Sequence, residues 1–112
     1  MSEQVNMVDT DTVLDWIKAD KVVIVDVRER HDHEAVRIPG SVLRPLSEFD
    51  PKQLPPVPEG KKLLLHCRSA NRCGVAAGQL VDSGYKGEIN RLTGGMNAWV
   101  AAGAPTEGNE AA

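Results

Sequence analysis

The sequence predicts an α/β fold in which an open, mostly parallel sheet carries helices on both faces. Two short runs, Val22–Val25 and Leu63–Leu65, are apolar without interruption. Strands buried on both faces of a parallel sheet have this pattern, whereas half-exposed antiparallel strands alternate apolar and polar residues. Segments with helical spacing alternate with the strand candidates. Such alternation indicates crossover units, with helices packed on both sides of one sheet.

The remaining elements follow from local patterns along the chain. One helix is predicted where Val13, Leu14 and Ile17 follow a Thr-Asp start, and another where Val75, Ala76, Gln79 and Leu80 follow the second cysteine. The segment Asp50–Gly60 holds four of the seven prolines and is therefore expected to be a surface connection. The weaker predictions are strands at Gln4–Val8, Ser41–Arg44 and Glu88–Leu92, one helical turn around Ser47–Phe49, and a last helix at Asn97–Ala102 ended by Gly103 and Pro105.

Length and composition indicate one small globular domain. The chain has 112 residues, of which 41% are hydrophobic, enough for a core without disulfide or metal staples. We expect the domain to span residues 1–105 and residues 106–112 to form a flexible tail, because this tail has no apolar residue larger than alanine. The net charge of −3 argues against a nucleic-acid binder.

Localisation can be anticipated from what the sequence lacks. Two cysteines do not form a secreted disulfide framework, and Glu3, Asp9, Asp11 and Asp15 interrupt the N-terminal segment, where a signal peptide would need an apolar run. No stretch has the length needed to span a bilayer. We therefore expect a cytoplasmic protein that is monomeric and binds no membrane.

The segment that carries chemistry runs from Leu63 to Gly74. An apolar strand ends at His66, a short polar loop follows, and a helix is predicted to begin near Arg72. Ligands of open α/β sheets bind at the carboxyl ends of the strands, which is where Cys67 is placed. Free amides of the loop, the helix N-terminus and the charges of Arg68 and Arg72 all favour a thiolate, and such settings lower a cysteine pKa from about 8.5 to roughly 3.5–7.5.

Less reactive interpretations compete for the same residues. A single cysteine is often an inert core residue, but a loop with two arginines is poor core material, so Cys67 is predicted to be a nucleophile. Cys73 is predicted to pack at the helix start, with a resolving or regulatory thiol as the alternative. His66 is interpreted as a strand-end residue rather than a base. Cys67, Cys73 and His66 do not supply the four ligands of a structural zinc site.

Three segments together resemble the rhodanese family of single-domain sulfurtransferases. They are the loop Cys67-Arg68-Ser69-Ala70-Asn71-Arg72; Asp26-Val27-Arg28-Glu29 with Ile38-Pro39-Gly40-Ser41; and Leu92-Thr93-Gly94-Gly95-Met96-Asn97-Ala98-Trp99 with Gly103-Ala104-Pro105. Each alone is a weak signal, whereas the three in this order are specific. The resemblance covers the chain from about Val5 to Pro105 and implies a rhodanese-like open sheet.

The resemblance also implies an activity. Cys67 would accept the outer sulfur of thiosulfate as a persulfide, release sulfite, and pass the sulfur to cyanide, a thiol or a sulfur-acceptor protein. The main-chain amides of Arg68, Ser69, Ala70, Asn71, Arg72 and Cys73 would cradle the persulfide. The Arg68 and Arg72 side chains would hold the incoming anion, while Asp26 and Arg28 would be structural. Covalent catalysis by a thiolate needs no cofactor and no metal.

The chain departs from the family pattern at four positions. Ala70 stands where the family often has Gly, Cys73 where Ser or Thr is common, Arg37 where His is frequent, and His33 where an aromatic residue is frequent. A requirement for positive φ at position 70 would therefore give this loop a different shape or some strain. The acceptor preference of the family does not transfer automatically to this chain.

Three other functions compete with thiosulfate use. A persulfide carrier for a biosynthetic partner would use the same Cys67. A rhodanese-like phosphatase or arsenate reductase would resemble Cys-x5-Arg, whereas Cys67 to Arg72 is Cys-x4-Arg, which favours sulfur transfer. A non-catalytic binding module would usually lack the cysteine. Charge favours an anionic substrate, because residues 60–81 carry +4 and the rest of the chain −7.

Overall fold

The structure, a computed structural model, describes residues 4–69 and 71–110. Within these residues, five strands form one sheet in the order β1-β5-β4-β2-β3, and every neighbouring pair is parallel. The strands are β1 (Val5–Val8), β2 (Val22–Asp26), β3 (Val42–Leu43), β4 (Lys62–His66) and β5 (Ile89–Leu92). The predicted open parallel sheet is confirmed, and each of the weaker strand predictions contains an observed strand.

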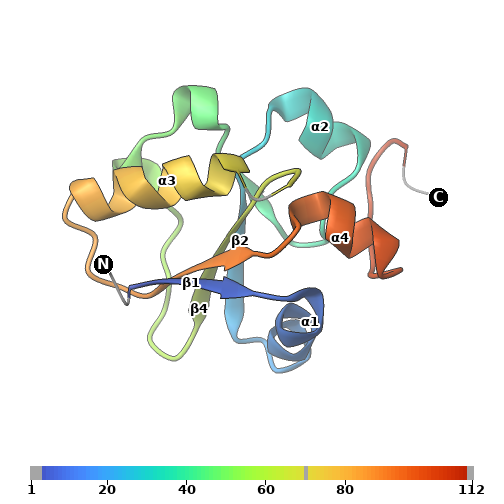
Figure 1. Cartoon of the computed structure of the whole chain (residues 1–112), viewed down its shortest axis with the longest axis horizontal. Helices are drawn as coiled ribbons and strands as arrows, with labels where there is room; N and C mark the ends of the chain where they lie inside the picture. Colours follow the sequence, from blue (N-terminus) through green and yellow to red (C-terminus); the bar gives the residue numbers. More distant parts are fainter. Residues whose placement is uncertain (1–3, 70, 111–112) are drawn as a thin grey trace.

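The central strand β4 is buried on both faces, as its uninterrupted apolar run predicts. Leu63 and Leu65 pack in the core beneath helix α3 (Asn71–Asp82), whereas Leu64 packs on the opposite face. That opposite face is covered by α1 (Thr10–Lys18) and α4 (Gly95–Ala101), which contribute Val13 and Trp99. Figure 1 shows α3 on one side of the sheet and α1 on the other. Helices therefore cover both faces.

The helix boundaries follow from local capping. Helix α1 begins after Asp9, whose carboxylate accepts a hydrogen bond of 2.9 Å from the Thr12 amide. Helix α3 begins at Asn71, one residue before the predicted start. Helix α4 begins at Gly95, two residues earlier than predicted, because the left-handed backbone of Gly94 turns the chain directly into the helix.

Helix α2 (Arg30–Ala35) was not predicted from the sequence. It has no buried residue, so it shows no apolar periodicity, but Glu29 and Asp32 form a capping box at its start. That Glu-x-x-Asp pattern was the available signal. Two 3₁₀ turns, Leu46–Glu48 and Pro51–Gln53, occupy the proline-rich connection between β3 and β4, where one helical turn was expected.

The described part of the C-terminal segment is tied to the domain. We expected a flexible tail from Thr106, yet four backbone hydrogen bonds join Glu107, Asn109 and Glu110 to residues 34–37. The Arg37 guanidinium also contacts the Glu107 carboxylate at 3.1 Å. Backbone pairing does not require apolar side chains, which is why composition did not reveal it. In the described ranges 4–69 and 71–110, no helix has the length and apolarity needed to cross a membrane.

Candidate active site

Cys67 lies immediately after the carboxyl end of β4, the central strand of the sheet, and is 1% exposed. Its Sγ accepts a hydrogen bond of 3.4 Å from the main-chain amide of Cys73, in the first turn of α3. The positive end of α3 is therefore close to the sulfur. A thiol held against a helix N-terminus at this edge of a parallel sheet can act as a nucleophile.

The other predicted site residues differ in their exposure to solvent. Arg68, Ser69 and Asn71 are exposed, and Ala70, with its expected effect on loop shape, lies outside the described residues. The Arg72 guanidinium lies 3.9 Å from the Asp32 carboxylate of α2, and its side chain is 36% exposed. The structure thus places Arg72 at the rim of the loop, where an anion can reach it from solvent.

The positive charge of residues 60–81 is not gathered around Cys67, which corrects the expectation from the sequence. Lys61 pairs with Asp20 at 3.3 Å and Lys62 with Glu88 at 3.1 Å. Both lysines lie at the amino end of β4, whereas Cys67 follows its carboxyl end. The linear charge count overlooked that a strand separates its two ends in space. Of the four basic residues in that segment, only Arg68, in the loop after β4, and Arg72, in the first turn of α3, lie at the same end of β4 as Cys67.

The start of α4 holds the backbone of the loop after β4 in place. The Met96 amide donates to the Cys67 carbonyl at 2.7 Å, and the Asn97 amide donates to the Arg68 carbonyl at 3.0 Å. Gly95 makes this approach possible, because a Cβ there would lie 2.4 Å from the Cys67 oxygen. Figure 1 shows the β4–α3 loop beside the start of α4. The family resemblance assigned no role to Gly95, and the structure gives it this contact.

A buried ion pair underlies the neighbouring strand end. Asp26 is fully buried, and Arg28 contacts it through Nη2 at 2.8 Å and through its main-chain amide at 2.9 Å. His33 Nδ1 lies 2.9 Å from the same carboxylate. Burial raises the pKa of Asp26, but hydrogen bonds from Arg28 and His33 and the nearby His66 hold it below its usual value. Arg28 and Asp26 occupy the structural position that we expected for them.

His66 is the last residue of β4, as expected, and its ring is fully buried. The ring Nε2 lies 3.9 Å from the Asp26 carboxylate, beyond hydrogen-bonding distance. Burial lowers the pKa of His66 to about 4, although the Asp26 charge acts in the opposite direction. His66 is therefore a neutral core side chain at pH 7.

This burial gives a pH-dependent stability. Because the unfolded pKa of His66 is 6.5 and the folded pKa about 4, its contribution is present above pH 6.5 and is lost as the pH falls toward 4. We expect the free energy of unfolding, measured by urea denaturation, to drop over this range by about 3 kcal/mol on this account. His66→Gln should remove that pH dependence, and the exposed control His31→Gln should keep it. Equal slopes in the two variants would contradict this assignment.

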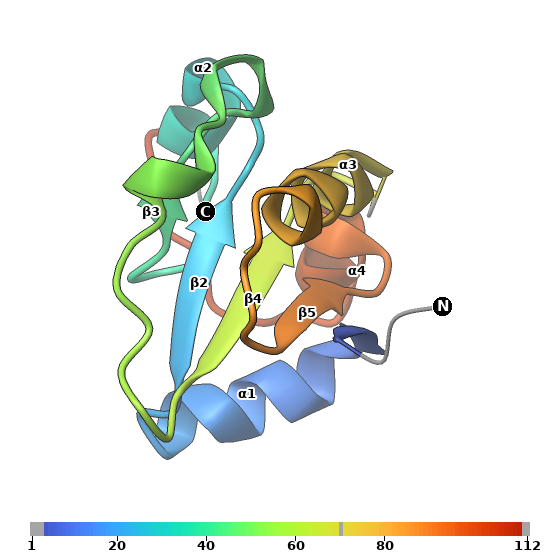
Figure 2. The same cartoon turned by 90° about the vertical axis from the view of Figure 1, so that its left-hand side faces the viewer.

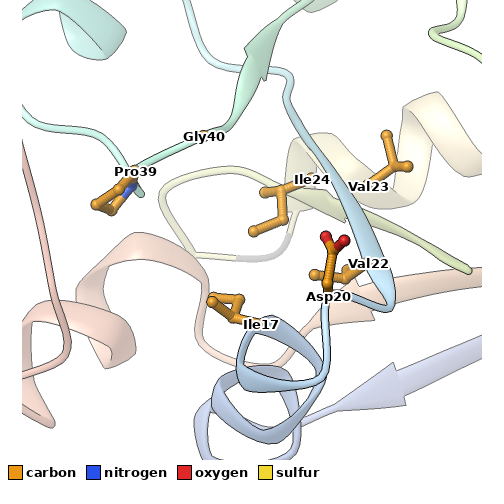
Figure 3. A pocket seen from close by; sticks show the side chains of 7 residues that line it. All are labelled: Ile17, Asp20, Val22, Val23, Ile24, Pro39 and Gly40. Atoms are coloured by element: carbon orange, nitrogen blue, oxygen red, sulfur yellow. The ribbon is translucent and has the colours of Figure 1, made fainter.

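A mainly apolar pocket lies elsewhere on the molecule. It is lined by the end of α1, the first half of β2 and the Pro39-Gly40 turn (Figure 3). None of its lining residues belongs to the loop after β4, and its one titratable side chain is Asp20. In residues 4–69 and 71–110, moreover, no three His, Cys, Asp or Glu side chains are grouped to hold a metal ion. This pocket is therefore separate from the loop that holds Cys67.

Comparison with known proteins agrees with this geometry. A family model of the rhodanese-like domain matches residues 9–102. The chain belongs to the rhodanese-like family. A sulfurtransferase of Allochromatium vinosum is 28% identical over 102 residues, covering 90% of this chain and 94% of that protein. The structure of a thiosulfate sulfurtransferase from Pseudomonas aeruginosa is 26% identical with a TM-score of 0.79, covering 99% of this rhodanese-like chain and 21% of the other.

Membership of the rhodanese-like family does not by itself define the reaction. An uncharacterized protein of Synechocystis sp., slr1261, is 45% identical over 87 residues, covering 78% of this chain and 48% of that protein. This rhodanese-like chain therefore spans about half the length of that relative. A tRNA uridine(34) hydroxylase of Bacillus thuringiensis is 30% identical over 87 residues, covering 71% of this chain and 26% of the enzyme. The resemblance to sulfurtransferases is established at the level of the family.

Proposed function

We propose that this protein is a thiosulfate sulfurtransferase that moves a sulfane sulfur to cyanide or a thiol through a Cys67 persulfide. The observation that carries the proposal is the position of Cys67 Sγ, which follows the central strand and accepts the Cys73 amide at 3.4 Å. The rhodanese-like family and the sulfurtransferase relative support the same reaction class. The identity of the donor and of the acceptor is part of the proposal.

The reaction has two displacement steps. The Cys67 thiolate attacks the outer sulfur of thiosulfate, the sulfur–sulfur bond of the donor breaks, and sulfite leaves with the bonding electron pair. Cyanide or a thiolate then attacks the outer sulfur of the persulfide and restores the Cys67 thiolate. Dividing one transfer between two attacks by good sulfur nucleophiles lowers each barrier. The amide of Cys73, in the first turn of α3, together with amides of the loop, stabilises the anionic sulfur.

Intact-mass analysis with a panel of sulfur donors tests this function. At early times after mixing with thiosulfate, the protein is expected to carry one extra sulfur atom and to lose it on addition of cyanide, with formation of thiocyanate. Glutathione and dithiols replace cyanide in parallel reactions. Loading from thiosulfate that discharges only to an acceptor protein would instead support a persulfide carrier. No gain of sulfur at any time point and no released sulfide from any donor, in wild type and in Cys73→Ser alike, would refute sulfur transfer and favour a binding module.

The spacing of the loop distinguishes the proposal from phosphate chemistry. Cys67 and Arg72 are separated by four residues, and the position that a Cys-x5-Arg loop would give to arginine is held by Cys73, which is fully buried. A buried thiol cannot bind a tetrahedral oxyanion as an arginine does. Hydrolysis of an aryl phosphate that disappears in Cys67→Ser would overturn this conclusion.

Arg72→Ala is expected to raise KM for thiosulfate. The guanidinium stands at the rim of the loop, where it can form a charge-assisted contact with the dianion, and such contacts are worth about 1.5–3 kcal/mol. This corresponds to an increase in KM of roughly 10- to 100-fold at 1.4 kcal/mol per factor of ten. Arg72→Lys keeps the charge and should lose less. If KM measured by thiocyanate formation is unchanged in Arg72→Ala, Arg72 has no role in binding.

A further inference from the structure

Cys73 is a second thiol in contact with the nucleophile, and the proposed transfer uses only its main-chain amide. That amide lies 3.4 Å from Cys67 Sγ, and the Sγ of a cysteine is only three bonds from its own amide nitrogen. Both residues are buried in the same core cluster beneath α3. A hydrogen bond to Cys67, followed by burial, strongly raises the pKa of Cys73. Cys73 therefore keeps its proton as long as Cys67 is a thiolate.

The guanidinium of Arg91, a residue of strand β5, lies close to Cys73. Arg91 lies on β5, where its Cα pairs with that of Leu65, two residues before Cys67. Its guanidinium passes beneath the first turn of α3, because a Cβ at Gly74 would lie 2.7 Å from Arg91 Nη2. The hydrogen bond and the charge of Arg91 act to lower the pKa of Cys73, against the effects of Cys67 and burial. The second thiol thus has a fixed positive charge beside it.

We propose that Cys73 resolves the Cys67 persulfide when no acceptor is present, by releasing hydrosulfide and closing a Cys67–Cys73 disulfide. This inference rests on the proposed function, which supplies the persulfide. It adds to the transfer reaction a step that releases sulfide and an inactive disulfide form in which Cys67 cannot accept sulfur.

The step is balanced without an external oxidant. Cys73 Sγ attacks Cys67 Sγ, the bond between Cys67 Sγ and the outer sulfur breaks, and that sulfur leaves as hydrosulfide carrying the Cys73 proton. The outer sulfur is reduced and Cys73 is oxidised, while Cys67 keeps its oxidation level, since a persulfide already has the oxidation level of a disulfide. A thiol or dithiol reductant reopens the disulfide by thiol–disulfide exchange.

Persulfide formation itself prepares Cys73 for this attack. When the persulfide forms, the negative charge moves from Cys67 Sγ to the outer sulfur. Cys73 then no longer donates a hydrogen bond to an anionic Cys67 Sγ, and the effect that raised its pKa is lost. Arg91 remains beside Cys73 and stabilises the thiolate that attacks. External acceptors attack the outer sulfur, whereas Cys73 adjoins the inner one, so the two reactions compete for one intermediate. Supply of acceptor decides between transfer and release.

The test follows single-turnover loading without acceptor. The intact protein is incubated with thiosulfate or inorganic polysulfide, and its mass, its released sulfide and its disulfide-linked peptides are measured over time. Wild type is expected to end two hydrogens lighter, with one sulfide released per chain and Cys67 linked to Cys73. Cys73→Ser, which keeps the amide, should retain one extra sulfur and release no sulfide. A wild-type protein that keeps its extra sulfur and releases no sulfide overturns the inference and leaves the proposed function intact.

The outcomes of the two proposals differ in these samples. If Cys73→Ser gains no sulfur from either donor, the proposed function fails, and the inference fails with it. Arg91→Met provides a second readout, the pH dependence of the rate of sulfide release, which would not change if Arg91 were only structural. Because removing the cation raises the pKa of the attacking thiol, sulfide release is expected to slow by about tenfold per pKa unit and to recover as the pH is raised. Arg91→Lys should stay near wild type. An Arg91→Met rate equal to wild type at every pH overturns the role of Arg91.

Discussion

Replacing Cys67 by serine is expected to abolish thiocyanate formation from thiosulfate and cyanide. The hydroxyl keeps the size of the side chain and can accept the Cys73 amide, but it cannot form a persulfide. Activity should therefore fall to the uncatalysed background, with a free energy of unfolding close to that of wild type. Steady-state thiocyanate assays and urea denaturation on the same preparations measure the two quantities.

Cys73→Ser is the matched control for this experiment. Cys73 lies six positions further along the chain, in the first turn of α3, is equally buried, and undergoes the same replacement of sulfur by oxygen. Because its contribution to the transfer step is a main-chain amide, Cys73→Ser is expected still to form thiocyanate. Equal loss in both variants would show that the Cys73 thiol takes part in the transfer reaction itself.

Gly95→Ala is expected to damage both stability and activity. A Cβ at this position would lie 2.4 Å from the Cys67 carbonyl oxygen and 2.6 Å from the Arg68 carbonyl carbon. These are backbone atoms that cannot rotate away, so the loop or α4 must move. Residue 95 also has a φ of +56°, which a side chain disfavours. Overpacking together with the left-handed backbone should cost about 2–4 kcal/mol of unfolding free energy.

The loss of activity should exceed what unfolding explains. Displacing the loop by about 1 Å moves Cys67 relative to its amide donors, and misplacement of that size can reduce a rate by roughly 100-fold. Gly103→Ala is the control, because Gly103 has a φ of +72° but a Cβ added there would meet no atom within 4 Å. It should show the backbone penalty alone, with activity retained. If the two variants lose the same activity, the contact between α4 and the loop does not position Cys67.

The sequence was sufficient to predict those elements whose residue pattern lies within one continuous segment. The apolar runs of β2 and β4 predicted buried parallel strands, and Cys67 was placed at the carboxyl end of a strand from its neighbours alone. Helix α2 was not predicted because it has no buried residue and only its capping residues distinguish it in the sequence. A pattern based on burial cannot detect an element that has no buried face.

What the sequence did not predict depends on contacts between distant segments. Gly95 touches Cys67, and Arg91 reaches Gly74, only because β5 pairs with β4 in one particular register. The expected clustering of Lys61 and Lys62 with Arg68 and Arg72 was wrong because strand β4 lies between the two pairs and holds them at its opposite ends. Which charged side chains lie close together is decided by the strand pairing of the folded sheet. The sequence alone predicts such closeness only within a single turn or loop.

The hydrogen bonds between α4 and the loop turn two amides into reporters of the active site. The amides of Met96 and Asn97 donate to the carbonyls of Cys67 and Arg68, so they can exchange their hydrogens with solvent only when the loop separates from α4. Figure 2 shows α4 and α3 close to each other at the end of β4 where this loop lies. Deuterium uptake at these two amides therefore measures how often the loop that holds Cys67 separates from α4, without a label on the cysteine.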